Sequence, residues 1–89
     1  MLSGMPKQAL QERDPYLVTL GEQIRHMRLM SGWTQDEFAA LTGLHRTHPS
    51  KLEKGLIDPR LSTLRRIARV FGVAVRVLLP TDLAGDDHV

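Results

Sequence analysis

With 89 residues, the chain is long enough for one domain with a modest core, and no apolar run approaches the ~20 residues of a membrane span. It contains no cysteine, which excludes a disulfide framework and a thiolate metal site. Its net charge of +2 is unevenly placed: residues 16–79 hold ten Lys and Arg against five Asp and Glu, and three Asp fall in the last eight residues. This favours a polyanionic partner, although charge placed only for solubility would give the same totals.

The first fourteen residues are polar, lack periodicity and contain Gly4 and Pro6, so we expect residues 1–14 to form a flexible N-terminal arm. They show no apolar block followed by a small-residue cleavage site. We therefore expect no signal peptide, no membrane association and a cytoplasmic location.

The first helix is expected from about Pro15 to Met30. Asp14 suits its N-cap, Pro15 suits its first turn, and Gly32 suits the left-handed residue that ends it. Apolar residues recur at spacings of three and four, which predicts one buried stripe: Leu17, Leu20, Ile24 and Met27.

A second, two-turn helix is expected after Thr34, because Thr34 and Glu37 have the spacing of a capping box. Gly43 should end it after Thr42. Its buried face is predicted to consist of Phe38, Ala39 and Leu41.

The next segment, 45–55, contains Pro49, which has no N–H to donate and disfavours helical geometry at the residue before it. Near a helix start that cost is small. We expect regular helix from about Pro49 to Lys54, ended by Gly55, with residues 46–48 in an extended turn or a loose first turn.

A loop with an Asp-Pro turn signal precedes a fourth helix that should end at Gly72. Its buried face is predicted to hold Leu61, Leu64, Ile67, Ala68 and Phe71. Three arginines fall largely on the other side: Arg65, Arg66 and Arg69.

Residues 73–79 are strongly apolar and have two interpretations. Alternating valines favour a strand, and a short fifth helix is the competitor. Pairing with a second copy would cover this surface, so we expect a dimer interface here, although the segment could instead fold onto its own domain. The predicted interface residues are Val73, Val75, Val77, Leu78 and Leu79. Residues 80–89 should form a mobile acidic tail.

A short capped helix, a tight turn centred on glycine and a second short basic helix are typical of a helix-turn-helix. The chain over residues 17–79 resembles the Cro/phage-repressor type (XRE-like) helix-turn-helix transcriptional regulators. The matching positions include Leu20-Gly21, Ile24-Arg25, Arg28, Gly32, Thr34-Gln35, Glu37, Ala39, Gly43, Arg46-Thr47, Ser50, Leu52-Glu53, Gly55, Pro59, Leu64, Ile67-Ala68 and Gly72-Val73.

The resemblance implies an all-α, lambda-repressor-like domain of four or five helices over residues 15–79. It also implies a homodimer that reads double-stranded DNA without a cofactor and acts as a repressor-type regulator. It further implies an ion pair between Arg28 and Glu53. The residues expected to contact DNA are Thr34, Gln35, His45, Arg46, Thr47, His48, Ser50, Lys51, Lys54 and Arg60.

Side-chain chemistry supports three of these contacts independently. Arg46 can donate two hydrogen bonds to guanine, and the Thr47 methyl group can meet thymine. Lys51 follows Thr47 by about one helical turn, so both can face one groove. Pro49 leaves two outcomes open: a shifted helix start retunes which bases are read, or it weakens sequence-specific binding.

Other functions are less well supported by the residues. His45 and His48 have the spacing of metal ligands, but no third ligand lies nearby, so we expect no metal site. No nucleophile elbow or paired carboxylates are evident, so we expect no enzyme. The remaining alternative is an antitoxin-like protein-interaction module that binds a toxin-like partner through residues 73–89, with DNA binding secondary.

Overall fold

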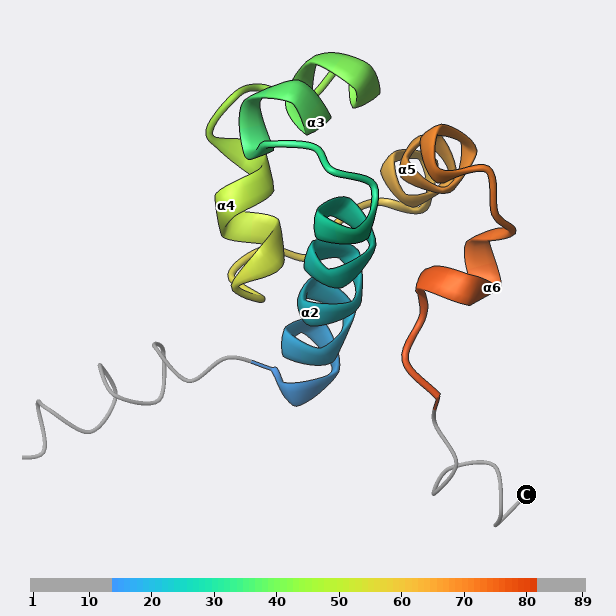
Figure 1. The fold of residues 1–89 in the computed structure, drawn as a ribbon. Coiled ribbons are helices and arrows are strands. Elements are labelled where there is room, and N and C mark those ends of the chain that lie inside the picture. The colour runs from blue at the N-terminus through green and yellow to red at the C-terminus, as the bar shows by residue number, and fades with distance from the viewer. Residues whose placement is uncertain (1–13, 82–89) are drawn as a thin grey trace, which may run out of the picture.

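The computed structural model describes residues 14–81, which form five helices (Figure 1). They are α2 (Pro15–Met30), α3 (Gln35–Thr42), α4 (His48–Glu53), α5 (Leu61–Phe71) and α6 (Val75–Leu78). The all-α prediction is therefore confirmed for the described part, which contains no strand. None of these helices is long and apolar enough to cross a membrane. The predicted N-terminal arm, apart from its last residue, and the predicted tail from residue 82 onward lie outside the described residues.

Local capping signals set the ends of the first two helices, as predicted. The Asp14 carboxylate accepts a hydrogen bond from the Tyr16 N–H at 2.8 Å, which caps the start of α2. At the start of α3, Thr34 Oγ1 accepts from the Glu37 N–H at 3.0 Å, and Glu37 Oε1 accepts from the Thr34 N–H at 2.8 Å. Gly43 ends α3 with a left-handed φ of 76°.

The predicted buried face of α3 was wrong at Leu41, whose residue surface is 51% exposed. Thr42 is buried in its place. Its hydroxyl can be buried because Thr42 Oγ1 donates to the Phe38 carbonyl at 2.7 Å, so no polar group is left without a partner. Leu41 lies about 100° round the helix from Thr42 and faces outward.

The core lies where α2, α3, α4, α5 and α6 meet. Its buried members are Leu20, Ile24, Phe38, Leu52, Leu64, Ile67, Ala68 and Leu78. Three aromatic rings stack beside it: the centroids of Trp33 and Phe71 lie 5.6 Å apart, and those of Phe38 and Phe71 5.4 Å apart. The prediction that Leu61 is buried was wrong, because it is 65% exposed. It is the first residue of α5 and precedes the turns that carry the buried residues.

The apolar segment 73–79 forms the helix α6, so the strand alternative was wrong and the short fifth helix is what the structure shows. A single turn places Leu78 fully in the core, with Val73 and Val75 packed beside it. The domain therefore covers Leu78 and part of Val73 and Val75 itself, whereas Val77 and Leu79 stay exposed at 41% and 37%.

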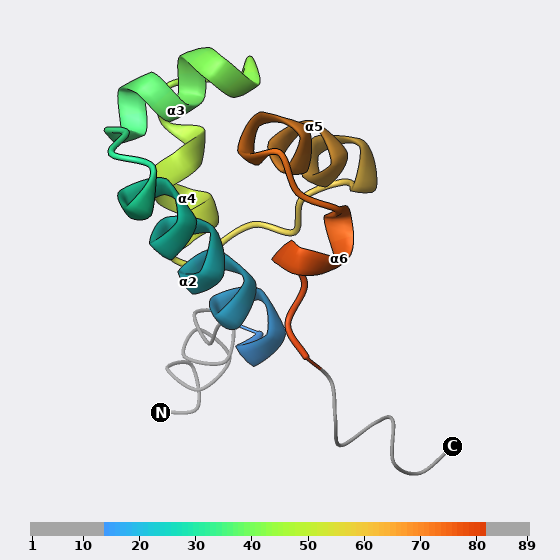
Figure 2. The ribbon, with the colours of Figure 1, turned by 45° about the vertical axis from the view of Figure 1, so that its right-hand side comes forward.

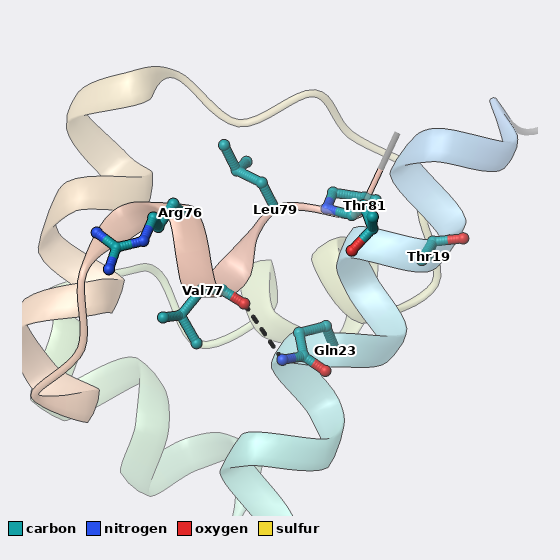
Figure 3. Close-up of a pocket in the computed structure, with 7 residues that line it drawn as sticks. Thr19, Gln23, Arg76, Val77, Leu79 and Thr81 are labelled. Carbon is teal, nitrogen blue, oxygen red and sulfur yellow. Dashed lines mark hydrogen bonds between the residues drawn. The ribbon is translucent and has the colours of Figure 1, made fainter. Parts of the chain in front are cut away.

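Polar contacts attach α6 and the residues after it to α2. Gln23 Nε2 donates to the Val77 carbonyl at 3.3 Å, and the Tyr16 hydroxyl lies 3.5 Å from the Pro80 carbonyl. Figure 3 shows the first of these contacts beside a pocket of about 400 Å³ between the two helices. Its lining is Thr19, Gln23, Arg76, Val77, Leu79, Pro80 and Thr81.

The helices divide into two groups around the core. α4 packs against α2 and α3, whereas α5 packs against α3 and α6. Two views separated by 45° both place α4 to the left and α5 to the right (Figures 1 and 2).

Candidate nucleic-acid interface

The link between α3 and α4 is a short, hydrogen-bonded turn. The Leu44 N–H donates to the Ala39 carbonyl at 3.0 Å, which closes the end of α3. Further on, His45 Nδ1 accepts from the Thr47 N–H at 3.2 Å and lies 2.9 Å from Thr47 Oγ1. The His48 N–H donates to the His45 carbonyl at 2.9 Å. Residues 46 and 47 thus form a turn before α4, as predicted, but the turn is hydrogen-bonded and neither extended nor loose, and residue 48 already belongs to the helix.

Pro49 is the second residue of α4 and is fully buried. At that position its missing N–H leaves no intrahelical hydrogen bond unmade, because the first N–H groups of a helix have no partner there. The helix begins at His48, one residue before the predicted start, and ends at Glu53, with Lys54 as its C-cap. Pro49 therefore helps to start the helix and does not interrupt it.

The predicted DNA contacts differ in exposure. Seven are exposed and three are half-buried: Gln35, His48 and Ser50. The exposed ones are Thr34, His45, Arg46, Thr47, Lys51, Lys54 and Arg60. Those around α4 sit on the turn before it and on the helix side that faces away from its buried residues, Pro49, Leu52 and Glu53. Thr34 and Gln35 lie where α3 begins, and Arg60 immediately precedes α5.

A buried ion pair joins α2 to α4. Arg28 Nε donates to Glu53 Oε2 at 2.6 Å and Arg28 Nη2 to Glu53 Oε1 at 3.1 Å, with side chains only 7% and 3% exposed. Arg28 Nη1 also donates to the Trp33 carbonyl at 2.8 Å. The ion pair that the resemblance implied is therefore present, and it is bidentate and removed from solvent.

Gln35 completes this network from α3. Its Nε2 donates to Glu53 Oε1 at 3.1 Å, so the Glu53 carboxylate accepts hydrogen bonds from residues on two other helices. The sequence assigned Gln35 to a phosphate or a base, and its link to Glu53 was not predicted. No short-range pattern could have revealed it, because eighteen residues separate the two. The network fixes α4 relative to both α2 and α3.

Two glycines let the chain around α4 approach α2 closely, a role the sequence analysis missed. A Cβ built on Gly21 would lie 2.4 Å from the Leu52 carbonyl oxygen and 2.6 Å from that of Glu53. A Cβ on Gly55, just beyond α4, would lie 2.8 Å from the Val18 Cα, and Gly55 has a left-handed φ of 73°. Gly21 itself was the signal available in the sequence. Glycine inside a helix lowers stability, so its presence there indicates that another part of the chain packs closely against it.

A further contact holds the end of α3. Arg66 Nη1 of α5 donates to the Thr42 carbonyl at 3.1 Å, close to Gly43. A cation at this position also suits the negative end of the α3 dipole. Within residues 14–81 no group of three His, Cys, Asp or Glu is arranged to hold a metal ion.

A helix-turn-helix family model matches residues 24–78 of the chain. A hypothetical transcription factor of Neisseria meningitidis is 35% identical over 77 residues, which cover 85% of this chain and 72% of the relative. The crystal structure of the hypothetical transcription factor NHTF from Neisseria superposes with a TM-score of 0.70 at 30% identity, over 83% of this chain and 85% of that one.

The restriction-modification controller protein C.AhdI of Aeromonas hydrophila gives a TM-score of 0.68 at 28% identity, over 71% of this chain and 96% of that one. The matched region of the family model includes α3, the turn and α4, together with the ion pair that holds them. On this evidence the chain belongs to the helix-turn-helix family of transcriptional regulators.

Proposed function

We propose that the protein binds double-stranded DNA sequence-specifically as a homodimeric regulator of the repressor type. In this proposal α4 and the turn before it enter the major groove. The observation that carries it is the combination of exposed Arg46, Thr47 and Lys51 with a helix held rigidly from its buried side. A reading helix must present polar side chains outward while its orientation is fixed from behind.

The side chains divide into base readers and phosphate ligands. Arg46 is suited to guanine through two parallel donors, and Lys51 reaches the same groove from one turn further on. The turn contacts of His45 and Thr47 hold Arg46 between two fixed neighbours. The remaining members of the predicted set flank this tip and are suited to phosphates: Thr34, Gln35, His48, Ser50, Lys54 and Arg60.

We expect Arg46→Ala to weaken binding to a selected site by roughly 1–3 kcal/mol and to relax the base preference at one position in each half-site. Sites would first be selected from random duplex DNA, then affinities measured by fluorescence anisotropy on the selected site and on single-base variants. The control is Arg25→Ala, which removes an exposed arginine on α2 and should leave binding unchanged. If Arg46→Ala weakens binding equally at every site, with base preference unchanged, Arg46 contacts phosphates and its role as a reader is contradicted.

The homodimer is proposed to form around α6. The exposed apolar surface there includes Tyr16, Val77 and Leu79, which lie near one another because Tyr16 reaches Pro80. A second copy would cover this surface and bring two reading helices onto one face of the DNA, about one turn or ~34 Å apart. Val73, Val75 and Leu78 are turned toward the core and would support the interface from behind.

Val77→Asp is expected to convert the dimer to a monomer, because a charge would have to be desolvated at the interface. Sedimentation equilibrium measures the mass, and circular dichroism checks that the fold persists. Leu61→Asp is the matched control, because Leu61 is also an exposed aliphatic residue but lies on α5, away from the proposed interface. A wild-type protein that sediments as a monomer at high concentration would refute the dimer.

In this proposal the protein has no catalytic role and acts in the cytoplasm, where its DNA target would lie. It is favoured over the antitoxin-like alternative because the relatives are named as transcription factors and regulators. No toxin-like partner enters the proposal.

A further inference from the structure

The pocket of about 400 Å³ between α2 and α6 has no part in the proposed reading of DNA, because none of its lining residues belongs to the set expected to contact DNA. Thr19 and Gln23 come from α2, and the others come from α6 and the residues that follow it (Figure 3). Its volume lies within the range of small-molecule sites, roughly 300–1,000 Å³. The pocket is therefore large enough to hold a small ligand.

The pocket presents hydrogen-bonding groups that the fold does not use. Within residues 14–81 the hydroxyls of Thr19 and Thr81 make no hydrogen bond. Gln23 uses one amide N–H to donate to the Val77 carbonyl at 3.3 Å, which leaves its second N–H and its Oε1 open. These groups can therefore bind a polar molecule without breaking any contact of the fold.

Arg76 gives the pocket a positive charge. It is the only charged residue of the lining, it is exposed, and among the described residues its guanidinium has no hydrogen bond and no carboxylate partner. Figure 3 shows its side chain at the α6 edge of the pocket, with the guanidinium turned outward. Because no described contact holds it there, the side chain can swing over the pocket and pair with an anion through two parallel hydrogen bonds.

One wall of the pocket is apolar. Val77 and Leu79 are 41% and 37% exposed, and Pro80 continues the same wall. Covering this surface with apolar atoms is favourable. An inorganic anion such as phosphate would leave the wall in contact with water, so the lining favours an organic ligand with an apolar side.

We propose that this pocket binds a small organic anion, namely a carboxylate attached to an apolar group. The carboxylate would pair with the Arg76 guanidinium, and the apolar group would cover Val77 and Leu79. Because the walls belong to two helices, the ligand would hold the single turn of α6 against α2. Binding does not depend on the proposed function. Only an effect on assembly does, since Val77 and Leu79 also belong to the proposed dimer surface.

A side chain of a second copy is a less suitable occupant of the pocket. Four of the seven lining residues are polar, whereas the exposed side chains near it, Tyr16, Val77 and Leu79, are largely apolar. An apolar side chain would remove water from the polar groups without replacing their hydrogen bonds, which costs free energy. A carboxylate ligand would satisfy these groups instead.

The test is a titration of the isotope-labelled, full-length protein with benzoate, followed by nuclear magnetic resonance. Shift changes should be confined to the Gln23 side-chain amide and the backbone around residues 76–81, and should saturate in the millimolar range expected of so small a ligand. Benzamide has the same shape without the charge and should bind roughly tenfold more weakly, because a hydrogen bond to a charged group contributes more than a neutral one.

Arg76→Gln removes the cation and should weaken benzoate binding by roughly tenfold for the same reason. The matched control is Arg69→Gln on α5, which removes another exposed arginine and should leave benzoate binding unchanged. Circular dichroism checks that both variants fold. The proposal is overturned if no saturable shift appears around the pocket, if benzamide binds as well as benzoate, or if the two variants lose affinity equally.

These outcomes are separable from those that test the proposed function, because the titration contains no DNA. A protein that binds benzoate in this pocket but sediments as a monomer would refute the dimer and leave the ligand site standing. A dimer that reads a selected DNA site but shows no benzoate shifts around the pocket would refute the ligand site alone.

Discussion

Glu53→Ala is expected to destabilise the protein by about 3–5 kcal/mol, because it leaves the buried Arg28 guanidinium without its carboxylate. The Arg28 and Glu53 side chains are only 7% and 3% exposed, so water cannot replace the missing partner without opening the contact between α2 and α4. Domains of this size have total stabilities of roughly 5–15 kcal/mol. The variant should therefore be partly unfolded or melt far below the wild type.

Thermal and urea unfolding followed by circular dichroism would measure this loss. Glu22→Ala removes an exposed carboxylate from the middle of α2 and should change stability by no more than about 0.5 kcal/mol. The double variant Arg28→Met with Glu53→Met should be less destabilised than Glu53→Ala, since neither charge is then left alone. If Glu53→Ala and Glu22→Ala behave alike, the buried network does not hold α4 in solution.

Gly21→Ala is expected to destabilise the fold by roughly 1–3 kcal/mol, although helix propensity alone predicts a gain of about 0.5–1 kcal/mol. The added methyl would lie 2.4 Å and 2.6 Å from two carbonyl oxygens of α4. These are backbone atoms, so no side-chain rotation can relieve the overlap, and α2 and α4 must move apart. The opposite signs of the two effects make the measurement decisive.

Unfolding midpoints compared with those of Glu22→Ala, on the next residue of α2, would show the effect. A domain of this size should lose roughly 4–8 °C of Tm per kcal/mol. DNA affinity should fall beyond the change in stability, because α4 would be displaced even in folded molecules. A rise in Tm for Gly21→Ala would show that α2 and α4 do not approach this closely.

The helix boundaries could be predicted because their signals are local. Asp14, the Thr34–Glu37 capping box and Gly43 act within three residues of the helix ends that they define. Such contacts depend only on residues that are neighbours in the sequence, and they are present in the structure. The family resemblance depended in part on the spacing of Thr34, Glu37 and Gly43.

The wrong predictions concern residues whose burial depends on contacts between helices that are far apart in the sequence. Periodicity allowed Leu41 and Leu61 on buried faces, but only the position of neighbouring helices decides which turn of a stripe is covered. The valines of 73–79 favour a strand intrinsically, yet burying Leu78 required a helical turn. Tertiary packing overrode a weak local preference in each case.

The candidate interface divides in the same way. The exposed side chains of 45–51 could be predicted, because a helix-turn-helix pattern fixes where they stand relative to Gly43. The contacts that hold these side chains in place could not be predicted. Gln35 and Glu53 lie far apart in the sequence, and so do Gly21 and Leu52. Sequence therefore predicted the exposed side chains of the candidate interface better than the contacts that hold them in place.

The turn before α4 also determines which hydrogen-bonding group His45 shows to its surroundings. Its Nδ1 accepts the Thr47 N–H, so in the neutral ring the proton must reside on Nε2. The backbone thereby selects one tautomer, and the exposed imidazole offers a donor at its outer edge and no acceptor.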